Sequence, residues 1–170
     1  MLDMVKVNFI QIKNFNLEIR GNTPCGLIKA TGSIKISNCT LTIKGDILDN
    51  GGGFVSVTDN TTSPFKSIIV EKSFVHVQGN IGSNSGPIVG FIANGNNLNI
   101  DKSVSVVLGN ISSNAGAFIG AYGGINKSTT ISNSYCFLSG QMAEFSGVLA
   151  GSYFASNGIA NISNVVLITN

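Results

Sequence analysis

Short runs of alternating hydrophobic and polar residues recur along the chain. In residues 40–44, Leu41 and Ile43 alternate with Thr40, Thr42 and Lys44. Successive side chains of a β-strand point to opposite faces, so this pattern predicts a strand with one apolar face. Each such run ends at a glycine, and these glycines recur at a spacing of about 30 residues, at Gly21, Gly45, Gly79, Gly109 and Gly140.

Two further blocks complete each repeat. From Gly45 onward, a second glycine stands seven residues after the first and opens a short apolar run, at Gly52, Gly86, Gly116 and Gly147. A block led by Ile or Val then closes the unit, at residues 36–39, 70–73, 100–103, 131–134 and 162–165. Self-similarity with this period is typical of solenoids and other repeat arrays.

The repeat predicts an all-β fold, a parallel β-solenoid of about five coils of about 30 residues, with three short strands per coil. Residues 1–170 are expected to form a single domain that is either a fragment of a longer repeat array or a subunit that stacks on another molecule. The unit between Gly45 and Gly79 is longer than the others, and a protruding loop is predicted near residues 58–64. The expected inward columns are Leu17, Leu41, Val75, Ser105 and Cys136; Ile19, Ile43, Val77, Val107 and Leu138; and Ile36, Val70, Ile100, Ile131 and Ile162.

Polar residues recur at the predicted turns. One column follows the first glycine of each unit and consists of Asn22, Asp46, Asn80, Asn110 and Gln141. A second consists of Asn50, Asn84 and Asn114. Asparagine tolerates left-handed backbone angles, and stacked amides can hydrogen-bond along a column. We interpret both columns as structural ladders.

Composition and charge exclude several classes of protein. The 170 residues carry a net charge of only +2 and few charged side chains, unlike the clustered basic face of a nucleic-acid-binding protein. No stretch reaches the roughly 18 apolar residues that a membrane-spanning helix needs. The cysteines Cys25, Cys39 and Cys136 match no metal or redox spacing, so we interpret Cys39 and Cys136 as small packing residues.

The few groups that could carry chemistry do not form a recognisable catalytic pattern. His76 is the only histidine, which argues against a metal site or a catalytic triad. Glu71 and Asp101 occupy one slot in adjacent coils and are expected to lie about 5 Å apart. Such a pair could serve glycosidic chemistry or bind Ca²⁺, but Lys72 and Lys102 follow directly, which favours a solvated charge cluster. We therefore predict a non-enzyme without catalytic, cofactor-binding or metal-ligating residues, and no cofactor.

The outward positions of the first strand change character along the column. They are polar in the early coils, for example Thr40 and Thr42, and apolar in the later ones. An exposed apolar patch of a few hundred Å² usually marks an interface. The predicted interface residues are Phe74, Val104, Val106, Tyr135, Phe137, Val166 and Ile168. A register error of one residue would exchange the two faces, and a terminal element of the same fold could instead cover this one.

The C-terminal half resembles the GLUG-type repeat. Residues 116–120 are Gly-Ala-Phe-Ile-Gly, similar to the Gly-apolar-apolar-Gly opening of that repeat, and residues 131–135 have its Ile-x-Asn-Ser-Tyr close. The match is looser over 147–165, and residues 86–103 keep the opening only. Proteins with such repeats are typically large surface or secreted proteins, including adhesins. The resemblance implies an extracellular or cell-surface scaffold and carries over no catalytic residue.

These observations predict a noncatalytic structural or adhesive β-solenoid of a surface fibre or filament. It is expected to assemble through its ends and the apolar lateral face, with another copy or another chain of the same assembly as partner, and with no nucleic acid or membrane span. Asn60 and Asn126 lie in sequons in predicted loops and are the candidate glycosylation sites. The alternative is a carbohydrate-binding or carbohydrate-cleaving β-helix, for which glycans would be the partner. An ice-binding solenoid would need a repeated threonine face, and Thr40 and Thr42 are not repeated in the next coil.

Overall fold

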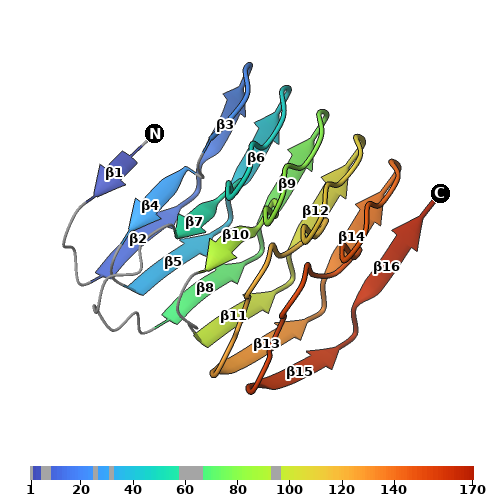
Figure 1. The fold of residues 1–170 in the computed structure, drawn as a ribbon. Coiled ribbons are helices and arrows are strands. Elements are labelled where there is room, and N and C mark those ends of the chain that lie inside the picture. Colours follow the sequence, from blue (N-terminus) through green and yellow to red (C-terminus); the bar gives the residue numbers. More distant parts are fainter. Residues whose placement is uncertain (1, 5–8, 25–26, 31–32, 58–66, 93–96) are drawn as a thin grey trace.

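The computed structural model describes residues 2–4, 9–24, 27–30, 33–57, 67–92 and 97–170. These residues form sixteen strands and no helix. All pairings between strands are parallel, and the chain winds past three sheets in turn, so that each coil lies beside the next one (Figure 1). The predicted all-β fold, a parallel β-solenoid, is confirmed.

The strands divide among three sheets, which we name A, B and C. Sheet A contains β1 (Leu2–Met4), β4 (Ile28–Ala30), β7 (Val55–Val57) and β10 (Val89–Ile92). Sheet B contains β2 (Phe9–Lys13), β5 (Ser33–Ser37), β8 (Ser67–Glu71), β11 (Asn97–Asp101), β13 (Ser128–Ser132) and β15 (Ile159–Ser163). Sheet C contains β3 (Asn16–Ile19), β6 (Thr40–Ile43), β9 (Phe74–Val77), β12 (Val104–Val107), β14 (Tyr135–Leu138) and β16 (Val166–Thr169).

The core lies between the sheets and is built from the inward columns. In sheet C, Leu41 pairs with Val75, and this column continues through Ser105 to Cys136; all four are buried. The polar member of the column is satisfied, because the Ser105 hydroxyl donates to the carbonyl oxygen of Ala117 at 2.6 Å. The two other predicted columns are likewise buried through the middle coils, whereas Ile162 in β15 is exposed. One apolar face per strand therefore closes a continuous core, as the alternation predicts.

The corner between sheets B and C is built from one residue per coil in the left-handed conformation. These residues have φ angles between 49° and 58° and are Asn14, Asn38, Lys72, Lys102, Asn133 and Asn164. Asparagine is the non-glycine residue that adopts this conformation most readily, and it occupies four of the six positions. The local sequence thus fixes a sharp bend at the same place in successive coils.

A glycine column is required where sheet C ends. A Cβ atom added to Gly109 would lie 2.5 Å from the carbonyl carbon of Gly79. A Cβ atom added to Gly79 would lie 2.5 Å from the carbonyl carbon of Gly45. Contacts this short do not occur for real Cβ atoms, so only glycine allows the coils to stack at this corner. The recurrent glycine of the sequence repeat is explained by this close approach between neighbouring coils.

Sheet A departs from the expectation of three strands in every coil. Beyond β10, the equivalent positions Ile119 and Ala150 form only isolated bridges. The apolar run there is cut short, because Tyr122 and Tyr153 follow it in the left-handed conformation, which a strand cannot contain. The loop predicted near 58–64 lies outside the described residues.

The close approach of the glycine column gives a direct test. Gly109→Ala should destabilise the protein by about 3 kcal/mol, because the methyl group must push the Gly79 backbone away. For a chain of this size that corresponds to a fall in Tm of about 6–12 °C, measured by thermal unfolding followed by circular dichroism.

Gly21→Ala is the matched control, because Gly21 starts the same column and nothing lies within 4 Å of the added atom. Its effect should stay within about 0.5 kcal/mol, as for an ordinary surface substitution. Equal losses of stability in the two variants would contradict the assignment.

Candidate functional site

The predicted interface residues form two parallel ladders on the outside of sheet C. Phe74, Val104, Tyr135 and Val166 are paired in register across β9, β12, β14 and β16. His76, Val106, Phe137 and Ile168 form the second ladder two residues further along the same strands. The residues between them point into the core, so the register places all eight side chains on the outer face.

The same face is polar in the first coils. Asn16 and Thr40 precede Phe74 in the first ladder, and Glu18 and Thr42 precede His76 in the second. Glu18 accepts a salt bridge from Lys44 at 3.1 Å and one from Arg20 at 2.8 Å. These two contacts lower the pKa of the Glu18 carboxyl, the Lys44 hydrogen bond contributing most. The outer face of sheet C is therefore charged at one end and apolar at the other.

The structure adds Leu108 to the apolar end. Its backbone N–H donates to the carbonyl oxygen of Val77, so the sheet C ladder continues one residue beyond β12, and its side chain is 45% exposed. The sequence pattern missed it because the equivalent positions in neighbouring coils are Lys44, Gln78 and Ser139. We call these eight outward residues of β9, β12, β14 and β16, together with Leu108, the sheet C patch.

The turn ladder that follows the glycine column is a chain of side-chain to backbone hydrogen bonds. The side-chain oxygen of Asn22 accepts the backbone N–H of Asp46 at 2.9 Å, and that of Asp46 accepts the N–H of Asn80 at 2.7 Å. The series continues through Asn110 to Gln141. The expected stacking of side-chain amides is seen instead in the second column, where the Asn84 amide donates to Asn50 at 3.0 Å. Both columns thus link consecutive coils through side-chain hydrogen bonds.

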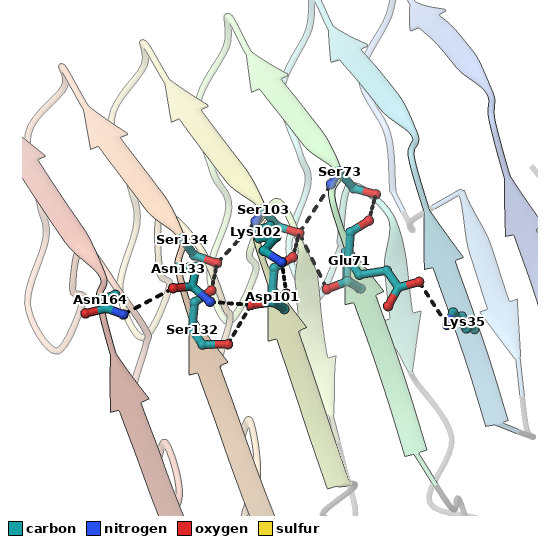
Figure 2. Close-up of polar contacts among 11 residues, drawn as sticks. Lys35, Glu71, Ser73, Asp101, Lys102, Ser103, Ser132, Asn133, Ser134 and Asn164 are labelled. Atoms are coloured by element: carbon teal, nitrogen blue, oxygen red, sulfur yellow. Dashed lines mark hydrogen bonds and ion pairs between the residues drawn. The ribbon is translucent and has the colours of Figure 1, made fainter.

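A ladder of serine residues runs through the buried corner between sheets B and C (Figure 2). The backbone N–H of Ser73 donates to the hydroxyl of Ser103, and that of Ser103 donates to the hydroxyl of Ser134, at 3.3 and 3.2 Å. Each hydroxyl in turn donates to the carbonyl oxygen two residues earlier in its own chain segment. Cys39 starts this column, with its N–H bonded to Ser73. These serines are structural, since each satisfies a backbone donor of the preceding coil.

The paired carboxylates of sheet B are engaged with different partners (Figure 2). Glu71 and Asp101 are aligned across β8 and β11, as the sequence predicts. Glu71 forms a salt bridge with Lys35 at 2.8 Å, whereas Asp101 accepts hydrogen bonds from Asn133 at 2.8 Å and Ser132 at 2.7 Å. The Asn133 bond, then the Ser132 bond, lower the pKa of Asp101 below its ordinary value. This arrangement suits a solvated charge cluster better than an acid–base pair, in which one carboxyl has a raised pKa.

The thiols of the described residues are not available for reaction. Cys39 and Cys136 are both buried and free. Burial raises the pKa of the Cys136 thiol to about 12, and its sulfur contacts the carbonyl oxygens of Ala117 and Val148 at 3.3 Å. A nucleophilic cysteine needs a lowered pKa, so Cys136 is a packing residue.

An aromatic row that the sequence pattern did not reveal runs from β10 of sheet A to the equivalent turns of the next two coils. The rings of Tyr122 and Tyr153 stack with centroids 4.9 Å apart and planes 8° apart, and Phe91 meets Tyr122 edge-on at 5.4 Å. The signal in the sequence is faint, because Tyr122 and Tyr153 share only the pattern Gly-x-Tyr after Gly120 and Gly151. Phe91 is shifted by one position relative to them.

Within the described ranges, no three His, Cys, Asp or Glu side chains are placed to hold a metal ion. None of the secondary structure in those ranges is a helix of the length and hydrophobicity needed to cross a membrane. The sequon residue Asn126 is exposed in a turn with φ 56°, whereas Asn60 lies outside the described residues. Comparison with protein-family models, curated proteins and solved structures found no match to the chain.

The Asp101 cluster predicts a specific titration. The pKa of Asp101 is lower in the folded protein than its ordinary value of 3.8. Ionised Asp101 therefore contributes stability that is fully present at pH values above 3.8 and is lost as the pH falls through the pKa of the folded state. Replacing both donors, with Ser132→Ala and Asn133→Gly, should raise the pKa of Asp101 toward 3.8. Glycine keeps the left-handed corner at residue 133. Carboxyl ¹³C chemical shifts followed by NMR measure the change, and a titration midpoint that the double substitution leaves unmoved would refute the assignment.

Proposed function

We propose that the chain is a noncatalytic structural or adhesive β-solenoid, and that the sheet C patch packs against a second copy within a larger assembly. The observation that carries the proposal is the segregation of the outer face of sheet C into a charged end and an apolar end. An outward-facing strand surface in contact with water normally carries polar residues throughout. Here three aromatic residues, Phe74, Tyr135 and Phe137, lie beside the valines of β12.

The size of the patch determines what kind of contact it can make. Four strands about 4.8 Å apart, with up to three outward residues each, cover on the order of 300 Å². This is an apolar patch of the size associated with interfaces, but a stable dimer buries about 800 Å² on each partner. The contact should therefore be weak and concentration-dependent for a single chain, and should hold firmly only where several copies are joined.

The charged end of the face favours a second copy as the occupant. Glu18, Arg20 and Lys44 would lose hydration if a partner covered the whole face. Two copies related by a two-fold axis through β12 and β14 would bring only the apolar ends together, and the charged ends would extend into water on opposite sides. A closed, self-complementary contact of this kind is the commonest form of homo-oligomer interface.

Two further arguments support a scaffold at the cell surface or outside the cell. The resemblance of residues 86–165 to GLUG-type repeats suggests a secreted or surface protein. Within the described residues, sheets B and C end at β2 and β15 and at β3 and β16, and pairing between such strand edges of different copies is the second part of the proposal. Together with the sheet C patch, stacked ends would give contacts along and across a fibre.

The sheet C contact can be tested by removing its centre. Val106→Ser combined with Phe137→Ser leaves the inward side chains intact and replaces two apolar outward residues by polar ones. Self-association of the wild type, measured by sedimentation equilibrium up to millimolar concentration, should weaken at least tenfold in this variant.

The control is Thr40→Ser with Thr42→Ser, which makes equally exposed changes on the polar end of the same face. It should associate as the wild type does. A wild type that stays monomeric, or a Val106/Phe137 variant that associates unchanged, would contradict the proposal.

A further inference from the structure

One side chain of the sheet C patch can change its charge near neutral pH. His76 occupies the second outward ladder, between Thr42 of β6 and Val106 of β12. It is the only histidine among the 170 residues. Histidine is the residue type whose charge ordinarily changes between pH 5 and 8, so this position connects the charge of the patch to the acidity of the surroundings.

His76 stands where the outer face of sheet C changes from polar to apolar. Thr42 precedes it in the ladder, and Val106 and Phe137 follow it. The side chain is half-buried in the single chain, and its ring centroid lies 6.3 Å from that of Phe74 on the same strand. A second copy that covers Phe74 and Val106 therefore also removes water from the imidazole between them.

The outward neighbours of His76 in sheet C carry no negative charge. They are Phe74 and Gln78 on its own segment, Thr40, Thr42 and Lys44 on the side of β6, and Val104, Val106 and Leu108 on the side of β12. Lys44 is itself positive, and its ammonium group pairs with Glu18 at 3.1 Å. The Glu18 carboxylate lies two strands away from His76 and also accepts Arg20. Phe74 does not offset a charge either, because an aromatic face attracts a cation within roughly 6 Å of its centroid.

Protonation of His76 therefore has different consequences in the free and the associated chain. Water solvates the imidazolium group when the face is open. In the two-fold arrangement, β9 of one copy lies opposite β16 of the other, whose outward residues Val166 and Ile168 are apolar. Burial of a charge without a partner is unfavourable, so the contact favours the neutral imidazole. Each copy contributes one His76, so both edges of the contact are affected.

We propose that His76 is a pH switch of the sheet C contact, in which the neutral imidazole allows two copies to associate and its protonation in mildly acidic solution separates them. This inference rests on the proposed self-association and adds its regulation. Coupling between two binding events is reciprocal. If association disfavours the protonated imidazole, protonation must weaken association to the same extent, and the contact loosens as the pH falls.

Sedimentation equilibrium of the full chain at pH 7.5 and pH 5.0, at one ionic strength, measures the effect. The dissociation constant of the wild type should rise by about tenfold or more at pH 5.0, because two imidazolium groups would lose water in the contact. The lowered pKa values of Glu18 and Asp101 keep these two carboxyl groups ionised at both pH values.

Two substitutions of His76 separate its charge from its shape. His76→Gln stays neutral, so it should associate as the wild type does at pH 7.5 and should lose the pH dependence. His76→Lys is charged at both pH values and should associate weakly at both. The inward neighbours Val75 and Val77 are unchanged, and circular dichroism at each pH checks that the fold is retained.

The single histidine also offers a second readout, because its imidazole signals in NMR spectra need no further assignment. Raising the protein concentration should move the midpoint of the imidazole titration to lower pH, by about one pH unit for a tenfold preference for the neutral form. The Val106→Ser, Phe137→Ser variant should show one midpoint at every concentration.

Three outcomes would overturn the switch and leave the proposed contact standing. They are equal dissociation constants at the two pH values, tighter association at pH 5.0, and a pH dependence that His76→Gln retains. A wild type that is monomeric at both pH values would instead overturn the contact and the switch together. The association measured at pH 7.5 thus distinguishes the two failures.

Discussion

The whole fold depends on the hydrogen bonds that each coil makes to the next one. These bonds continue through the corners as well as the strands. The backbone N–H of Ile81 donates to the backbone carbonyl oxygen of Asn110 at 2.8 Å, and that of Leu108 donates to the backbone carbonyl oxygen of Val77 at 2.9 Å. A buried backbone group must find a partner, so each coil has to follow the path of its neighbour. The glycine column, the left-handed corner residues and the serine and asparagine ladders are all consequences of that requirement.

The same requirement leaves the outer surface free to vary. Inward positions and corners are fixed by contacts to adjacent coils, whereas outward side chains face solvent and contact one another only on the surface. The outer face of sheet C can therefore change from charged at Glu18 and Lys44 to apolar at Val106 and Phe137 without altering the path of the chain. Phe145 and Tyr153 show that even a corner position can be given to a bulky side chain, at the expense of backbone strain.

The repeat allowed the solenoid, its inward columns and the register of sheet C to be predicted, because those features recur in every coil. Glu71 and Asp101 were correctly aligned, yet their separate partners, Lys35 and Asn133, depend on side-chain directions that spacing does not encode. The short length of sheet A and the aromatic row were missed for the opposite reason. They arise where the repeat is broken, at turns such as that of Tyr122, and a periodic pattern carries no information there.

The central claim is the in-register stacking of coils, which decides what faces inward and what faces outward. Nuclear Overhauser contacts from the backbone of Val106 in isotopically labelled protein test it most directly. In-register coils give contacts from Val106 to His76 on one side and to Phe137 on the other, with the Val106 side chain in contact with both. Contacts to Val75 and Cys136 instead would show a register shifted by one residue, and would exchange the core and the outer face of sheet C.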